Sequence, residues 1–210
     1  MKVYTNTKII TMDGGKVIPN GALLVDGSKI TAVLTMDEYG ARSGEFAGAE
    51  TVDCAGKVIM PGLINAHTHI TLWRSFGDIT LARDVATETM LAVRNSLNCL
   101  RKGVTTVRDM GHKDHVHNEM KVCAERGVIL APRFRCANAI IEMSNGHASH
   151  FCATVSTPQE MVSEIRRQVN AGTDFIKIVA SHDDLYHLDK LSYPWFSQED
   201  LNLLVAASHE

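Results

Sequence analysis

The strongest constraint on the fold is a strand–helix order that repeats four times after Pro61. Short apolar strands are expected at 63–67, 104–109, 131–137 and 175–179, and helical patterns follow at 81–100, 115–126, 157–172 and from 197 onward. This order is typical of parallel strands joined by crossover helices. A doubly wound sheet and a (β/α)8 barrel both fit it. No strand is followed by a GxGxxG sequence, so a Rossmann domain has no support.

Residues 1–60 have a different pattern, in which short β-prone runs alternate with turn signals. Asp26-Gly27 lies between two apolar runs, which is a strong hairpin signal. Residues 40–50 are mostly small and polar and are expected to form a loop. We therefore predict a small antiparallel sheet at 1–60 and a separate α/β unit at 61–210. A full barrel needs roughly 250 residues, so the second unit holds about half of one, with about four βα units.

Composition and charge exclude several classes of protein. The net charge of the 210 residues is -3, so there is no basic footprint for nucleic acid or an anionic membrane surface. No apolar stretch approaches the ~18 residues of a membrane span, and the first residues lack a signal-peptide core. The five cysteines are scattered and show no CxxC spacing, which favours reduced thiols in a cytoplasmic protein.

Two histidines, His67 and His69, follow the apolar run that begins at Val58. Side chains alternate along a strand, so residues i and i+2 project from the same face. Two imidazoles at the end of a buried strand can begin a metal site. The alternative is that one or both are packed or surface histidines, because two ligands alone do not make a site.

Lys177 is unusual because it lies in the middle of an apolar strand, Phe175 to Val179. Burial disfavours the charged form of a lysine. One interpretation is that its side chain reaches the strand end or pairs with Asp109 or Asp174. The other is a neutral or modified lysine at a metal site.

The remaining polar residues near the strands are expected to be structural. Arg108 and Asp109 end the second strand, and a structural salt bridge is the simpler role for both. His115 and His117 fall at a helix start and are expected to be solvated.

Three segments together resemble the N-terminal half of a metal-dependent amidohydrolase. They are the string from Val58 to His69 that contains Pro-Gly-Leu-Ile-Asn-Ala-His-Thr-His, the segment from Gly103 to Gly111, and the strand around Lys177. The resemblance spans essentially the whole chain and is most similar to the imidazolonepropionase-like and Xaa-Pro dipeptidase (prolidase-type) branch. It implies a partial TIM (β/α)8 barrel at 61–210, truncated after the fourth strand, and part of a β-sandwich at 1–60.

The resemblance also implies a metal centre and a reaction. His67 and His69 match the first-strand pair that binds the more buried metal, and Lys177 matches a carboxylated lysine that bridges two divalent ions, with Zn2+ as the expected metal. A bridging hydroxide would then hydrolyse a C–N bond of a small amide, dipeptide or cyclic amide. His147 matches a substrate-contacting histidine, although His150 competes for that role and a plain loop histidine is the alternative.

The family pattern also needs histidines on the fifth and sixth strands and a general-base aspartate on the eighth. These positions lie beyond Glu210, so no catalytic acid or base is predicted within the chain. We expect a truncated chain or one piece of a larger assembly, inactive alone and completed by a C-terminal half or by homo-oligomerisation. Two alternatives stay open: a mononuclear deaminase or chlorohydrolase of the same superfamily, whose sites lack the fourth-strand lysine, and a non-catalytic structural or oligomerising fragment.

Overall fold

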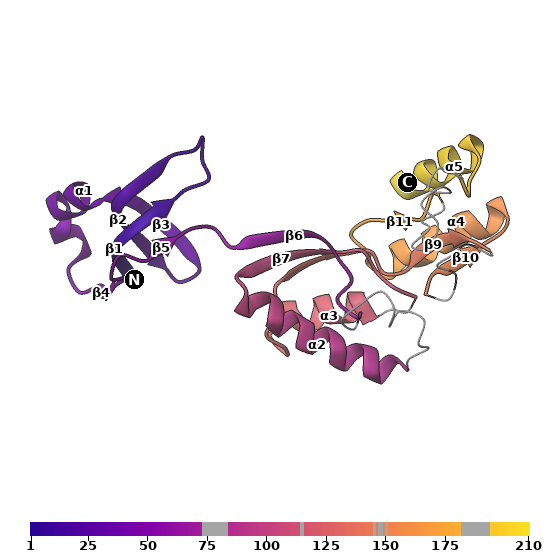
Figure 1. Ribbon diagram of the computed structural model, residues 1–210, viewed down its shortest axis with the longest axis horizontal. Helices are drawn as coiled ribbons and strands as arrows, with labels where there is room; N and C mark the ends of the chain where they lie inside the picture. Colours follow the sequence, from indigo (N-terminus) through magenta and orange to yellow (C-terminus); the bar gives the residue numbers. More distant parts are fainter. Residues whose placement is uncertain (73–83, 114–115, 145, 147–148, 150, 182–193) are drawn as a thin grey trace, which may run out of the picture. The chain divides into compact units, whose positions relative to one another are not determined.

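The computed structural model describes residues 1–72, 84–113, 116–144, 146, 149, 151–181 and 194–210. The chain divides into two compact units, Met1–Gly62 and Leu63–Glu210. Each unit is described by itself below, and their elements are labelled in Figure 1.

The first unit is a five-stranded sheet. Strands β1 (Lys2–Ile10), β2 (Val17–Asp26) and β3 (Lys29–Thr35) form an antiparallel meander, whose β2–β3 turn has Gly27 at φ 55°. Strands β4 (Glu50–Asp53) and β5 (Val58–Ile59) both run parallel to β1. The hairpin at Asp26-Gly27 is confirmed. The prediction of a purely antiparallel sheet is wrong. After β3 the chain crosses over to the other side of β1, so β4 and β5 run parallel to β1.

A short helix, α1 (Met36–Ala41), and a 3-10 turn at Ser43–Phe46 lie in that crossover. The loop predicted from residue 40 is therefore partly helical. Thr35 and Glu38 form a capping box: each side chain bonds the backbone N–H of the other residue. Such a box satisfies two otherwise unpaired donors of the first turn and fixes where the helix begins.

The second unit begins with three parallel strands in the order β6-β7-β8: β6 (Leu63–Thr68), β7 (Val104–Asp109) and β8 (Arg133–Cys136). Helices α2 (Val85–Arg101) and α3 (Val116–Glu125) connect them. Both helices lie on the same side of the strands in Figure 1, and Ala92, Val116 and Met120 pack there against Val107 and Phe134. The predicted parallel strands with crossover helices are confirmed here.

The parallel pairing continues beyond β8. Strand β9 (Ile140–Met143) lies between β10 (Ala153–Val155) and β11 (Lys177–Ile178), and all three are parallel. The amide of Asp174 donates to Cys136 O and that of Val179 to Ile141 O, both at 2.9 Å. Residues 174–179 therefore run beside 136–141, where the fourth strand was predicted. Strands β9 and β10 were not predicted.

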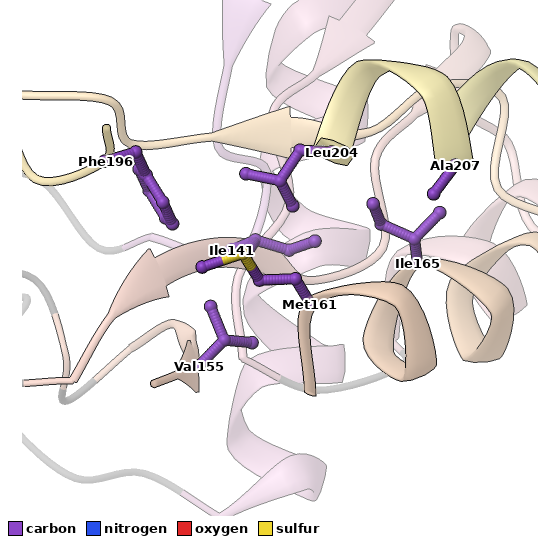
Figure 2. Close-up of a cluster of buried hydrophobic side chains, with 7 residues drawn as sticks. All are labelled: Ile141, Val155, Met161, Ile165, Phe196, Leu204 and Ala207. Atoms are coloured by element: carbon purple, nitrogen blue, oxygen red, sulfur yellow. The ribbon is translucent and has the colours of Figure 1, made fainter. Parts of the chain in front are cut away.

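Helices α4 (Pro158–Asn170) and α5 (Gln198–His209) cover this second sheet. Figure 2 shows the core between them, in which Met161 and Ile165 of α4 and Leu204 and Ala207 of α5 gather around Ile141. Both helices begin where the sequence predicts, and their N-caps are Thr157 and Ser197. In the described part of the chain, no helix is both long and apolar enough to cross a membrane.

Candidate metal centre

His67 and His69 lie close together at the C-terminal end of β6. Their ring centres are 5.6 Å apart, and the ring planes are inclined by 52°. A zinc ion about 2.1 Å from one nitrogen of each ring would place the ring centres roughly 5–6 Å apart. The pair therefore has the spacing that a shared metal ion requires.

A single hydrogen bond fixes the proton of His69. Its Nδ1 lies 2.7 Å from the carbonyl oxygen of Gly111. A carbonyl oxygen can only accept, so Nδ1 donates and the Nε2 lone pair stays available. Metal-binding histidines are usually held in this way, with one ring nitrogen donating to a carbonyl while the other binds the ion.

The surroundings of both rings favour the neutral form. Burial lowers the pKa of His69 below its ordinary value of 6.5, and the hydrogen bond to Gly111 opposes this only in part. Burial also lowers the pKa of His67, and the positive charges of Lys177 and Arg108 lower it further. The neutral imidazole is the form that binds a metal.

Arg108 lies on the face of β7 that points away from α2 and α3. Val107 and Asp109 of β7 are buried toward the helices, so Arg108 between them projects from the opposite face. The charges of Arg108 and Lys177 both act on His67. The structure thus brings Lys177 into the electrostatic neighbourhood of His67, although 110 positions separate the two residues in the sequence.

The carboxylates predicted as partners of Lys177 are engaged elsewhere. Asp174 accepts from Lys121 at 2.8 Å and from Arg135 at 2.9 Å, and Asp109 pairs with a histidine described below. Among the residues that the structure describes, Lys177 forms no ion pair. The pairing interpretation with Asp109 or Asp174 is therefore wrong.

Arg108 also differs from the expectation of a salt bridge. Its guanidinium lies 4.1 Å from the ring centre of Phe175, in a cation–π contact. Asp109 is hydrogen-bonded to His117, which lies on the first turns of α3.

His117 was expected to be solvated, and this was wrong. Both His117 and Asp109 are 0% exposed, and His117 Nδ1 bonds Asp109 Oδ2. The missed signal is the strand alternation of β7: Asp109 lies on the same side as buried Val107, and a buried carboxylate needs a partner from the helix that covers it.

A second buried pair, Glu88 and His112, was also missed. Glu88 lies on α2 with its Oε1 3.3 Å from His112 Nδ1. The His112 ring stacks on Phe151, with ring centres 5.7 Å apart and planes inclined by 11°. Glu88 had no distinguishing feature in the sequence, because a glutamate in a helical pattern is ordinarily exposed.

The predicted substrate residue His147 lies outside the described residues, as does its competitor His150. Over the described ranges, no group of three or more His, Cys, Asp or Glu side chains could hold a metal ion. A metal centre at His67 and His69 therefore needs Lys177 or further ligands.

Residues 58–185 match the model of the Amidohydrolase family. The chain belongs to the amidohydrolase family. It is an enzyme family, so the amidohydrolase resemblance and the enzyme class predicted from sequence are confirmed. The family as a whole generally depends on metal ions.

The names of similar proteins describe two kinds of activity, deamination and the cleavage of peptides that contain proline. A 5-methylthioadenosine/S-adenosylhomocysteine deaminase of Bacillus thuringiensis (strain Al Hakam) is 40% identical over 82 residues, which are 36% of this chain and 17% of that protein. Among solved structures, a Xaa-Pro dipeptidase with bound methionine superposes with a TM-score of 0.81 at 20% identity. A putative prolidase from Bifidobacterium longum gives a TM-score of 0.71 at 25% identity.

The two superpositions cover 99% of this chain but only 54% and 46% of those structures. The chain thus spans about half the length of its structural relatives and matches a smaller share of its curated ones.

Proposed function

We propose that this chain supplies His67, His69 and Lys177 to a binuclear metal centre of a hydrolase that cleaves C–N bonds. The observation that supports this most directly is the hydrogen bond from His69 Nδ1 to Gly111, because it leaves Nε2 as a ligand next to His67. The proposed substrates are small amides, dipeptides or cyclic amides, in keeping with the dipeptidase and prolidases among the structural relatives.

The proposed architecture is half of a (β/α)8 barrel at 61–210, preceded by a β-sandwich portion at 1–60. Two observations support it: parallel pairing continues from β6 through residues 174–179, and the chain spans about half of its structural relatives. In such barrels the sites lie at the C-terminal ends of the strands, which is where His67 and His69 lie on β6.

Lys177 is the residue that would make the centre binuclear. As an ammonium group it repels a proton on His67, and it would repel a cation in the same way. Conversion to a carbamate would replace this positive charge with an oxygen ligand of negative charge, which bound cations would compensate. Two divalent ions, with Zn2+ as the proposed metal, would supply an activated water and polarise the scissile carbonyl. His147 is proposed to contact the substrate.

A mononuclear deaminase is the second candidate. It is favoured by the deaminase that is 40% identical over 82 residues. Because such a site does not use the fourth-strand lysine, Lys177 separates the two candidates.

The test is zinc binding by the 210-residue chain, measured by competition with a chromogenic chelator and by metal analysis after gel filtration. His67→Ala and His69→Ala should each weaken the first zinc site at least tenfold, since each removes one ligand. His209→Ala is the matched control, because His209 is an exposed histidine at the end of α5 in the same unit.

Lys177→Ala then decides between the candidates. In the binuclear case it should reduce the zinc bound per chain, and 13C-bicarbonate should give a carbamate signal that the variant lacks. Unchanged zinc content with no carbamate signal would favour the mononuclear site. Zinc affinity that is the same in His67→Ala, His69→Ala and wild type would refute both.

A further inference from the structure

The buried pair of Asp109 and His117 takes no part in the proposed metal centre. Asp109 ends β7, His117 lies on α3, and both side chains are fully buried. A buried carboxylate is costly unless its oxygens are hydrogen-bonded. The two oxygens of Asp109 are both engaged, one by His117 Nδ1 and the other by the backbone.

The backbone group that Asp109 binds is next to His69. Asp109 Oδ1 accepts from the amide of Ile70 at 3.2 Å. On the other side of His69, the carbonyl of Thr68 accepts from the amide of Met110 at 2.7 Å. Hydrogen bonds from the end of β7 therefore hold the backbone immediately before and immediately after His69.

The side chain of His69 is bound by the same stretch of β7. Its Nδ1 donates to Gly111 O, two residues after Asp109. Gly111 has φ +85°, and a Cβ there would lie 2.9 Å from Asn138 O and 3.0 Å from Ala137 O. The acceptor carbonyl is thus held in place by close contact with the neighbouring backbone.

We propose that Asp109 and His117 are a positioning pair, which sets the backbone at His69 so that its Nδ1 reaches Gly111 and its Nε2 faces the metal. This inference rests on the proposed function of His69 as a ligand. The competing explanation is that the pair only ties α3 to β7. The two explanations differ in whether loss of the pair changes His69 in a protein that is still folded.

The test uses two pairs of variants that separate shape from hydrogen bonding. Asp109→Leu and His117→Leu remove the hydrogen bonds while keeping a buried side chain. Asp109→Asn keeps an acceptor for the Ile70 amide, and His117→Asn places an amide N–H where Nδ1 donates. Lys121→Ala is the matched control: it removes another side-chain contact of α3, the 2.8 Å ion pair with Asp174, and in the described residues neither Lys121 nor Asp174 is hydrogen-bonded to His69 or to the residues on either side of it.

Two measurements are made on each variant. The tautomer of His69 in the metal-free chain is read from 15N–1H correlations of the imidazole at about pH 8, where histidines are neutral. Zinc affinity is read from chelator competition. The leucine variants should lose the dominant Nδ1–H signal of His69 and bind zinc about 10- to 100-fold more weakly. The asparagine variants and Lys121→Ala should stay within about threefold of wild type.

The inference is overturned if the leucine variants are folded and keep the wild-type tautomer and affinity. It is also overturned if His69 in the wild-type chain itself carries its proton on Nε2, a result that does not depend on any variant folding. Failure of the proposed function looks different: wild type would bind no zinc, while the tautomer would still respond to Asp109→Leu.

Discussion

Gly111→Ala perturbs the acceptor of His69 without touching any ionisable group. At φ +85° an alanine is strained, and its Cβ would stand 2.9 Å from Asn138 O and 3.0 Å from Ala137 O. Both contacts are with backbone atoms, so no side chain can move aside to relieve them. Moving Asn138 would strain the 3.2 Å hydrogen bond that its carbonyl accepts from His112.

A matched control separates the two parts of the loss in stability, the strained backbone angle and the close contact of the Cβ. Gly103 has nearly the same backbone angle, φ +81°, but nothing lies within 4 Å of a Cβ built there. Gly103→Ala should therefore cost only the left-handed conformation, about 1–2 kcal/mol. Gly111→Ala should cost this amount plus about 1–3 kcal/mol for overpacking, and should weaken zinc binding because the Gly111 carbonyl moves.

Urea unfolding followed by tryptophan fluorescence measures the difference. Both tryptophans, Trp73 and Trp195, belong to the second unit in sequence, so the signal reports on the unit that holds the site. The midpoints at equal slope give the change in the free energy of unfolding. If Gly111→Ala were no more destabilising than Gly103→Ala and bound zinc equally well, the close backbone contact would not be what holds the carbonyl.

Two further predictions follow from the pKa values of buried groups. Burial lowers the pKa of His69 from 6.5, so below pH 6.5 the unfolded chain binds more protons than the folded one. The free energy of unfolding should fall as the pH drops below 6.5 and gain nothing from His69 above it; urea titrations of His69→Asn should show a flatter profile, and equal profiles would contradict the assignment. Burial also raises the pKa of Cys136 to about 12 and that of Cys152 even more. Iodoacetamide should label Cys54 before either of them in the native chain, as peptide mass spectrometry can check; labelling of Cys136 at the rate of Cys54 would argue against its burial.

Most of the second unit could be predicted because its local signals agree with its tertiary structure. The strands β6, β7 and β8 and the starts of α4 and α5 were all predicted from the sequence. Strand β10 was missed because three residues, Ala153–Val155, are too few for a periodic pattern. Helix α1 was missed although Thr35 and Glu38 carry the spacing of a capping box, because the small polar residues that follow outweighed it.

The candidate site divides in the same way. The i, i+2 spacing of His67 and His69 follows from strand geometry alone, and the structure brings their rings within 5.6 Å. The partners of buried charges could not be predicted, because they depend on which helix residue faces which strand residue. Asp174 pairs with Lys121 and Arg135 instead of Lys177. His117, which was expected in solvent, bonds Asp109.

The pleat of β7 separates the Asp109–His117 pair from Arg108. Asp109 and Arg108 are adjacent in sequence, yet one points into the helix layer and the other to the opposite face. The carboxylate of Asp109 is thereby bonded to His117 and forms no ion pair with Lys177. Lys177 has no carboxylate partner among the described residues, and its charge acts together with that of Arg108 on His67. Two positive charges near one imidazole favour an anionic ligand or a carbamate, so in the proposed centre the chemical state of Lys177 would set how many metal ions are held.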